Sequence, residues 1–295
     1  MAPNQHPHVH LDEADWDAMA EHNELEGEVL LAFVTDTAAE VLTVRGDGGP
    51  VVGRVLDVGS GAGVGTCELA RIFPEAEVVA VDSSSGMLER AARRAAALGL
   101  DARVRTVHAE VPDGVADLGP ADVIWASMSL HHVGDEVAAL RALGAALAPG
   151  GVLAIAELGD PMQVLPDDLD VGRPGLADRL VEAGAAWFAA MRDGLPDVVP
   201  SADLPTMVRA AGLEVVVARH VTEQLGPPLS ADGRRLAVEH LRRSNGRLAA
   251  SLDDDDLRTL DVLTDPDDPR SLHQRPDAVI VASRQIVIAR SEGGR

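Results

Sequence analysis

From about Arg54 onward, short apolar runs of the kind that form β-strands alternate with longer stretches whose apolar residues recur at helical spacing. Five strand candidates fall between residues 53 and 158, at 53–58, 78–81, 103–108, 121–126 and 151–158. Asp135 is expected to cap a helix that runs through Leu147 and stops at Pro149-Gly150-Gly151. Strands that alternate with helices in this way predict a parallel sheet covered by helices on both faces.

The rest of the chain is less regular. Helical patterns cover residues 174–192, 201–211 and most of 229–263, and strand candidates follow at 213–218 and 277–289. Together the segments predict an α/β fold, a Rossmann-like doubly wound, mostly parallel seven-stranded sheet with helices on both faces. The first of these helices carries a stripe of apolar residues on or near one face, formed by Leu176, Leu180, Trp187, Phe188 and Met191.

The first strand runs directly into a glycine-rich turn with the pattern D-x-G-x-G-x-G from Asp57 to Gly63. Glycines let the backbone turn sharply and let a ligand lie against bare amides, and the helix that follows adds a positive dipole. The turn therefore predicts a tightly held ligand, either a dinucleotide or S-adenosylmethionine. The dinucleotide pattern G-x-G-x-x-G is not met, because the sixth residue is Val64 or Thr66 in the two possible frames.

With these residues in place, the chain resembles the class I S-adenosylmethionine-dependent methyltransferases, specifically the small-molecule branch, over about residues 54–158. The resemblance implies that the acid and glycines of the turn contact the methionine end of the cofactor. It also implies that Asp82 accepts the ribose hydroxyls, that the segment around Glu110 contacts the adenine, and that the Leu130-His131-His132 stretch lies near the sulfonium. Many relatives have Asp at position 110, so Glu110 is a departure. The implied cofactor-binding residues are Asp57, Gly59, Ser60, Gly61, Gly63, Asp82, Ser83, Met87, Ala109, Glu110, Ser127, Met128 and His132.

Several of these residues have simpler structural interpretations. Asp57 could only cap the turn, Asp82 could be an ordinary N-cap of the next helix, and Met87 could belong to the core. These alternatives stay open on the sequence alone.

Three residues are candidates for the catalytic chemistry. Methyl transfer to a hydroxyl, phenol or activated carbon requires the acceptor to lose a proton, and histidine is the usual base. His131 and His132 follow the fourth strand at the carboxyl edge of the sheet, where open α/β folds bind ligands. If the segment is extended, the two rings point in opposite directions, and we place His131 nearer the acceptor and His132 nearer the cofactor. Glu157, at the end of the fifth strand, could orient the base or could be a solvated strand end.

We expect residues 1–45 to form an N-terminal helical cover and residues 46–295 to form the methyltransferase domain, with helical insertions at about 160–200 and 229–263. Trp16 and His22 in the cover could roof the site or could simply pack. The apolar stripe near Trp187 could likewise be a substrate lid or part of the core.

The amino-acid composition excludes or disfavours several classes of function. The 295 residues contain 25 Lys and Arg against 48 Asp and Glu, a formal charge of −23, which disfavours nucleic acid, anionic membranes and phosphorylated acceptors. There is no lysine and no tyrosine, which excludes a Schiff base, a Walker lysine and a Tyr/Lys hydride-transfer pair. Cys67 is the single cysteine, so an intrachain disulfide and a multi-thiolate metal site are excluded. The N-terminal residues lack the pattern of a signal peptide, and we expect a cytoplasmic protein.

Metal chemistry is not expected. His6, His8 and His10 alternate near the N-terminus, but a functional site would need more enclosure and a fourth ligand. The run from Asp253 to Asp256 is interpreted as a solvated helix start that the helix dipole favours.

The sequence therefore predicts a methyltransferase that acts on a small organic molecule, such as a secondary metabolite, by in-line displacement with His-assisted deprotonation. The alternative is an enzyme that binds S-adenosylmethionine but catalyses cyclisation, elimination or rearrangement. A binding module without chemistry and an NAD-type oxidoreductase are the remaining possibilities. We expect a small-molecule substrate, no nucleic-acid or membrane partner, and allow for a homodimer.

Overall fold

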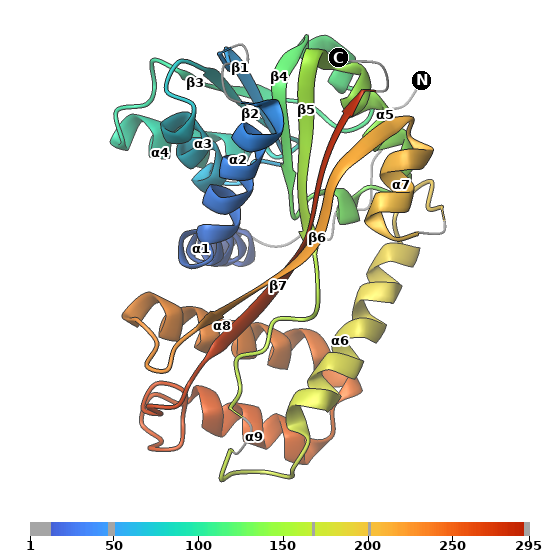
Figure 1. The fold of residues 1–295 in the computed structure, drawn as a ribbon. Helices are drawn as coiled ribbons and strands as arrows, with labels where there is room; N and C mark the ends of the chain where they lie inside the picture. Colours follow the sequence, from blue (N-terminus) through green and yellow to red (C-terminus); the bar gives the residue numbers. More distant parts are fainter. Residues whose placement is uncertain (1–12, 47–50, 167–168, 200–201, 292–295) are drawn as a thin grey trace. The chain divides into compact units, whose positions relative to one another are not determined.

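The structure is a computed structural model that describes residues 13–46, 51–166, 169–199 and 202–291. In this part of the chain, the strands form one seven-stranded sheet in the order β3-β2-β1-β4-β5-β7-β6 (Figure 1). The strands are β1 (Arg54–Val58), β2 (Glu77–Asp82), β3 (Val104–His108), β4 (Ala121–Ser127), β5 (Leu147–Leu158), β6 (Leu213–Leu225) and β7 (Ile280–Ser291). The pairs β1–β2, β1–β4, β2–β3 and β4–β5 are parallel, which confirms the predicted fold class.

The helices are α1 (Glu13–Val29), α2 (Ala32–Arg45), α3 (Val64–Ile72), α4 (Ser85–Ala97), α5 (Glu136–Ala145), α6 (Leu176–Asp193), α7 (Leu204–Ala210), α8 (Ala231–Leu248) and α9 (Asp254–Thr264). The chain divides into two compact units. Unit 1 comprises 1–157, 195–219 and 286–295, and unit 2 comprises 158–194 and 220–285. The predicted boundary between a cover and a methyltransferase domain near residue 45 stays a prediction.

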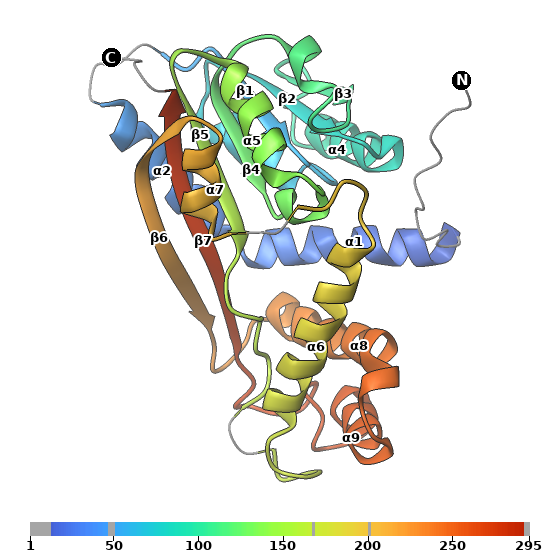
Figure 2. The same ribbon diagram turned by 90° about the vertical axis from the view of Figure 1, so that its right-hand side faces the viewer.

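The central strands of unit 1 are buried on both faces. Leu56 of β1 and Ile124 of β4 are fully buried in one large cluster, together with Leu140 of α5 and Val208 of α7. Ala80 of β2 instead belongs to a second cluster with residues of α4. Figure 2 shows α5 and α7 on one side of the strands, and Figure 1 shows α3 and α4 on the other. Burial on both faces explains why these strands read as continuous apolar runs rather than as alternating ones.

The strand register brings the functional segments to one edge. Val58 at the end of β1 is paired with Val81 of β2 and with Ala126 of β4, and Ser127 at the end of β4 is paired with Ala156 of β5. Parallel strands that end in register place the segments that follow them side by side. The glycine turn, Asp82 and the two histidines therefore meet at the carboxyl edge of the sheet.

Several predicted boundaries are wrong in detail. The helix expected to run through Leu147 ends at Ala145, because the carbonyl of Ala146 accepts a hydrogen bond from the amide of Ala121 and thereby draws the chain into the sheet. The expected stop at 149–151 falls inside β5, where the register with β4 shifts. The strand expected at 213–218 continues to Leu225.

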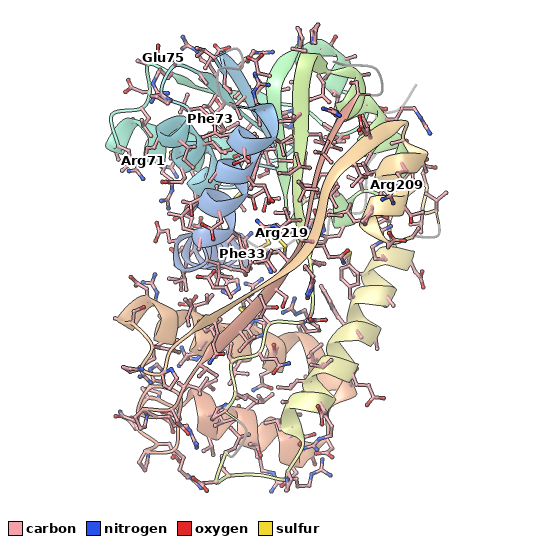
Figure 3. All side chains as sticks on the ribbon, viewed as in Figure 1. Phe33, Arg71, Phe73, Glu75, Arg209 and Arg219 are labelled. Carbon is pink, nitrogen blue, oxygen red and sulfur yellow. The ribbon has the colours of Figure 1, made fainter. Side chains whose placement is uncertain are left out.

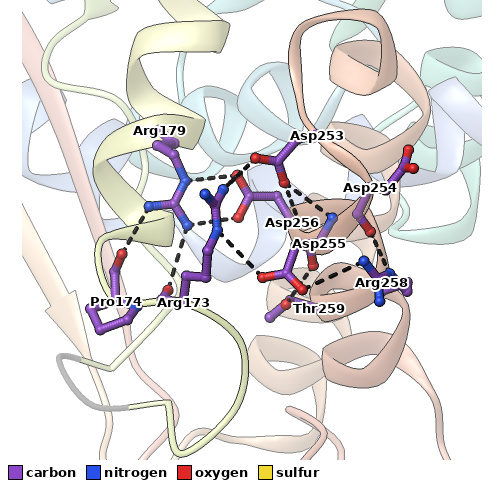
Figure 4. A network of polar contacts seen from close by, with 9 residues as sticks. All are labelled: Arg173, Pro174, Arg179, Asp253, Asp254, Asp255, Asp256, Arg258 and Thr259. Carbon is purple, nitrogen blue, oxygen red and sulfur yellow. Dashed lines mark hydrogen bonds and ion pairs between the residues drawn. The ribbon is translucent and has the colours of Figure 1, made fainter.

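The acidic run starts a helix, as its composition predicts, but it is not solvated throughout, because Asp256 is buried (Figure 4). Asp253 is the N-cap of α9, since its side chain accepts hydrogen bonds from the amides of Asp255 and Asp256. The Asp256 side chain is only 2% exposed and is bound at both oxygens by the guanidinium of Arg179, at 2.7 and 2.6 Å. Arg173 approaches the same carboxylate at 3.2 Å. Two arginines on or just before α6 therefore hold the start of α9 within unit 2.

The apolar stripe of α6 is only partly a core stripe. Leu176 is buried, whereas Trp187 is 38% exposed. The guanidinium carbon of Arg247 on α8 lies 4.7 Å from the centre of the Trp187 ring, the geometry of a cation–π contact. Whether Trp187 forms part of a lid stays a prediction.

An ion pair within unit 1 joins β6 to α2. Arg219 of β6 pairs with Glu40 of α2 at 2.7 Å, and Figure 3 labels Arg219. None of the helices in the described ranges is both long and apolar enough to cross a membrane.

Candidate functional site

The glycine turn after β1 is built from backbone conformations that side chains disfavour. Gly59, Gly61 and Gly63 have φ angles of +71°, +52° and +80°. A Cβ atom on Gly63 would lie 2.7 Å from the Cβ of Ala91, whereas a Cβ on Gly61 would meet no heavy atom within 4 Å. The turn is therefore packed against α4 on one side and open at Gly61.

Asp82 binds the turn directly. Its Oδ2 accepts a hydrogen bond from the amide of Gly61 at 2.9 Å, and its Oδ1 accepts one from the amide of Ser84 at 2.8 Å. Ser84, rather than Asp82, is the N-cap of α4, because its hydroxyl accepts a hydrogen bond from the amide of Met87. Each carboxylate oxygen of Asp82 keeps a second lone pair, so the group can still accept two hydroxyl donors.

Asp57 is the most buried acid of the turn, with 3% of its surface exposed. The hydroxyl of Thr66 donates a hydrogen bond of 2.5 Å to its Oδ2. Burial raises the pKa of Asp57 to about 7, the hydrogen bond from Thr66 opposes this rise, and the charge of Asp82 adds to it. Asp57 thus joins the end of β1 to the first turn of α3, as the turn-capping interpretation expects.

Two features of the turn fit the cofactor that the family resemblance implies. The Ser60 hydroxyl is buried without a hydrogen-bond partner among the described residues, and the space beside Gly61 is open. Backbone amides, a hydroxyl and a carboxylate are the groups that bind an amino acid and a ribose diol. The residues present therefore suit S-adenosylmethionine.

The remaining cofactor candidates differ in burial. Met87 is 6% exposed and packs in a small cluster with Ala20 of α1 and Ala62 of the turn. Ser83 and Glu110 are exposed, and the amide of Ala109 donates a hydrogen bond to the carbonyl of Asp82. Contact with a cofactor stays a prediction for all of these residues.

The N-terminal helix α1 lies against the same turn. Arg90 of α4 forms ion pairs with Asp17 at 2.7 Å and Glu24 at 3.1 Å, both on α1. His22 is buried at 7% exposure, whereas the side chain of Trp16, like the three N-terminal histidines, lies outside the described residues. These ion pairs hold α1 against α4, and the role of α1 as a cover over the cofactor site stays a prediction.

The segment after β4 is folded differently from the sequence expectation. Met128 has a φ angle of +52°, and Leu130–His132 form a turn of 3-10 helix rather than an extended stretch. The rings of His131 and His132 lie side by side with their centres 4.1 Å apart, so the expectation that they point in opposite directions is wrong. His131 is partly buried and His132 is exposed.

Glu157 organises this segment. Its Oε1 accepts hydrogen bonds from the amides of Ser129 and Leu130, both at 2.7 Å, and its Oε2 lies 2.7 Å from Nδ1 of His131. At 7% exposure it is not a solvated strand end. Burial opposes ionisation, but the hydrogen bond and charge of His131 and the two backbone amides outweigh it, so the pKa of Glu157 lies below its usual value.

The ionised state of Glu157 decides the tautomer of its neighbour. An ionised carboxylate can only accept hydrogen bonds. Nδ1 of His131 therefore carries the ring proton and donates a hydrogen bond to Glu157. In the neutral ring Nε2 is then the basic nitrogen. The arrangement can therefore accept a proton at Nε2 of His131 and stabilise the resulting imidazolium through Glu157.

Sequence reasoning missed two residues of this edge. Thr66 could have been found from its place in the first turn of the helix, where its side chain faces back toward Asp57. Ser129 donates its hydroxyl to the carbonyl of Val58 at 3.1 Å. No spacing rule predicts that contact, because Val58 ends β1 whereas Ser129 follows the end of β4.

A hollow of about 280 Å³ lies away from this edge. It is lined by residues that precede β1 and β2, among them Val52, Phe73 and Glu75, of which Figure 3 labels the last two. This places it at the amino ends of the strands, so it is not part of the candidate site. Within the described ranges, no group of three or more His, Cys, Asp or Glu side chains could hold a metal ion.

Comparisons with known proteins agree with the geometry. A family model described as a methyltransferase domain matches residues 55–151. Over 198 residues the chain is 32% identical to a demethylmenaquinone methyltransferase of Clavibacter sepedonicus, covering 65% of this chain and 78% of that protein. Over 196 residues it is 39% identical to a trans-aconitate 2-methyltransferase of Pseudomonas paraeruginosa, covering 65% of this chain and 61% of that one.

A solved structure shares the fold. A protein of Galdieria sulphuraria, provisionally assigned as a sarcosine dimethylglycine methyltransferase, aligns with a TM-score of 0.52 over 90% of this chain and 86% of that one. The two sequences are 16% identical, so the likeness concerns the fold alone.

Proposed function

The chain belongs to the class I S-adenosylmethionine-dependent methyltransferases, and from this premise we propose that it methylates a small organic acceptor without net negative charge, with His131 as the base. Secondary metabolites with a hydroxyl, phenol or activated carbon form the class of acceptor that we propose. The single observation that carries the proposal is the 2.7 Å contact between the buried Glu157 carboxylate and Nδ1 of His131 at the carboxyl edge of the sheet.

We propose that the turn and Asp82 hold the cofactor. The open backbone at Gly61 and the buried hydroxyl of Ser60 would receive its amino-acid end, and the carboxylate of Asp82 would accept the two ribose hydroxyls. Met128 and His132, which follow β4 at the same edge, would line the reacting end. Asp57 would act mainly by fixing the turn, since Thr66 already occupies it.

The chain's own residues supply alignment and a base. S-adenosylmethionine, when bound, would provide an electrophilic methyl group on a positively charged sulfonium, which leaves as the neutral thioether of S-adenosylhomocysteine. Holding the acceptor in line is the main contribution of the protein, because orientation alone can lower a barrier by roughly 7 to 11 kcal/mol. His131 takes the acceptor proton at Nε2, and Glu157 keeps the ring in the required tautomer and stabilises its charge.

The charge of the protein supports an acceptor that is neutral or cationic. With a formal charge of −23, the enzyme repels anions at long range. Two relatives are named for demethylmenaquinone and for trans-aconitate, which are a quinone and a carboxylic acid. On the electrostatic argument the quinone class is the better model for this chain.

A methyl-transfer assay tests the proposal. The enzyme is incubated with S-adenosylmethionine that is radiolabelled in its methyl group. The acceptors are neutral phenols, reduced quinones, amines and trans-aconitate. We expect label in a neutral or cationic acceptor, one S-adenosylhomocysteine per methyl transferred, and a turnover in His131→Asn that is strongly reduced but still measurable. Turnover of trans-aconitate above all others would contradict the charge argument, and acceptor conversion without S-adenosylhomocysteine would contradict methyl transfer.

A further inference from the structure

We infer that Ser129 is a positioning residue that holds His131 at a fixed place relative to the glycine turn 59–63. The inference rests on the proposed role of His131 as the base. The side chain of Ser129 lies between the proposed cofactor turn and the proposed base.

The first set of contacts joins Ser129 to the turn. Its hydroxyl donates a hydrogen bond of 3.1 Å to the carbonyl of Val58, the residue directly before Gly59. A Cβ atom on Gly59 would lie 2.3 Å from the Cβ of Ser129 and 2.9 Å from its hydroxyl oxygen. The serine side chain therefore occupies the space that a side chain at position 59 would fill.

The second set of contacts joins Ser129 to the base. Its amide donates to Oε1 of Glu157 at 2.7 Å, and the other oxygen of the same carboxylate holds Nδ1 of His131 at 2.7 Å. Ser129 is the N-cap of the short 3-10 turn in which His131 follows two residues later. One residue is thus bonded both to the end of β1 and to the carboxylate that orients the histidine.

The backbone before Ser129 shows that this position is imposed. Met128 is a residue other than glycine with a φ of +52°, a conformation that persists only when its surroundings fix it. Its amide donates to the carbonyl of Ala156 at 2.9 Å, which fixes one side of the reversal. The hydroxyl of Ser129 on Val58 fixes the other side.

This arrangement predicts an effect on the reaction rather than on cofactor binding. The hydroxyl is bonded to a backbone carbonyl of β1, which keeps its position in the sheet when the bond is lost. The segment that carries His131 would instead gain freedom. A misplacement of a reacting group by about 1 Å can lower a rate by about 100-fold, so even a small gain in freedom should be visible in kcat.

Hydrogen exchange tests the hold itself. The wild type and Ser129→Ala are compared with saturating S-adenosylhomocysteine as the probe. We expect the amides of residues 129 and 130 to exchange about 3- to 10-fold faster in the variant, with β1 exchange and the dissociation constant of the probe changed less than about twofold. Unchanged exchange at 129 and 130, or equal acceleration throughout β1 and β4, would overturn the inference. Ser244→Ala, which alters a buried serine of α8, is the matched control.

A kinetic cycle separates this inference from the proposed function. With the acceptor that the panel identifies, Ser129→Ala should lower kcat, leave KM for S-adenosylmethionine unchanged, and have no further effect in the His131→Asn background. An equal decrease in that background would overturn positioning through His131. Wild-type turnover by His131→Asn alone would overturn the base assignment, whereas the exchange experiment does not depend on that assignment.

Discussion

Thr66 of α3 donates a 2.5 Å hydrogen bond to Asp57 of β1, and this hydroxyl is the one donor that the buried carboxylate receives among the described residues. Glu157, at the same sheet edge, receives two backbone amides and a histidine. The contrast explains why the pKa of Asp57 is raised to about 7 whereas the pKa of Glu157 is lowered. The two carboxyl groups therefore differ in protonation state at neutral pH: Glu157 is ionised, whereas Asp57 is partly protonated.

Asp57 predicts a pH-dependent stability of the cofactor-free enzyme. Between about pH 4 and pH 7 the folded protein keeps a proton that the unfolded chain has released, so its stability falls as pH rises through this window. Asp57→Asn mimics the protonated acid and removes this dependence. From pH 5 to pH 8 the wild type should lose about 2 to 3 kcal/mol relative to the variant, measured by urea unfolding.

The comparison with Asp57→Asn isolates this one group, because both proteins share every other titration. Parallel stability curves for the two proteins across the range would show that Asp57 is ionised throughout, and the account of its burial would then be wrong.

Asp82 predicts a loss of cofactor affinity. Asp82→Ala removes the two lone pairs proposed for the ribose hydroxyls and should weaken S-adenosylhomocysteine binding by about 1.5 to 3 kcal/mol in calorimetric titration. Because the amide of Gly61 also loses its acceptor, part of this loss comes from the turn. Asp101→Ala, an exposed acid after α4, should bind as the wild type does. Unchanged affinity in Asp82→Ala would refute the ribose assignment.

Because Glu157 binds both the segment after β4 and His131, we expect its substitution to change stability and activity together. In Glu157→Gln the side-chain oxygen can still accept from the amides of Ser129 and Leu130, but these hydrogen bonds lose their charge. The NH2 group then faces Nδ1 of His131, which loses its acceptor and can no longer carry the proton there. We expect a loss of about 2 to 4 kcal/mol in unfolding free energy and a fall in kcat. Because the pKa of Glu157 is lowered in the folded state, the wild-type advantage is fully present above the ordinary carboxyl pKa. It is lost as the pH falls from there through the lowered pKa of the folded state.

The exposed acid Glu21 offers a control for this measurement, since Glu21→Gln makes the same chemical change at the surface of α1. If Glu157→Gln unfolded at the same urea concentration as Glu21→Gln, the carboxylate would not hold the segment after β4.

Asp256 predicts a stability effect in unit 2. Asp256→Ala leaves Arg179 and Arg173 without their shared carboxylate and should lower the unfolding free energy by about 1.5 to 3 kcal/mol. The pKa of Asp256 is lowered, chiefly by its hydrogen bond with Arg179, so this contribution vanishes in acid. Asp254→Ala removes an exposed neighbour of the same run and should change stability by less than about 0.5 kcal/mol. If the two variants lost the same unfolding free energy, Asp256 would contribute no more than a solvated acid of the run, and this account of it would be wrong.

The sequence predicted the sheet because its strands are buried on both faces and their apolar runs are bounded by glycine turns. It also placed Asp57, Asp82 and Glu157 at one edge, since parallel strands end together. It failed where tertiary contacts decide local structure. The 3-10 turn at Leu130–His132 forms because Glu157, 27 residues after Leu130, binds the amide of Leu130 and that of Ser129, the N-cap of the turn. No local pattern encodes that contact.

The same limit applies to Asp256. Its run of four acids has the composition of a solvated helix start, and Asp253 does cap the helix. The arginines that bury Asp256 lie 77 and 83 residues away in the sequence. The pairing follows from how α6 and α9 both pack against α8, which the spacing of charges within one segment cannot indicate.

The most direct test of the account is a crystal structure grown with S-adenosylhomocysteine. We expect the amino-acid end of the ligand against Gly59–Gly63 and its ribose diol on the carboxylate of Asp82. Density for the nucleoside anywhere else, or an empty edge at saturating ligand, would contradict it.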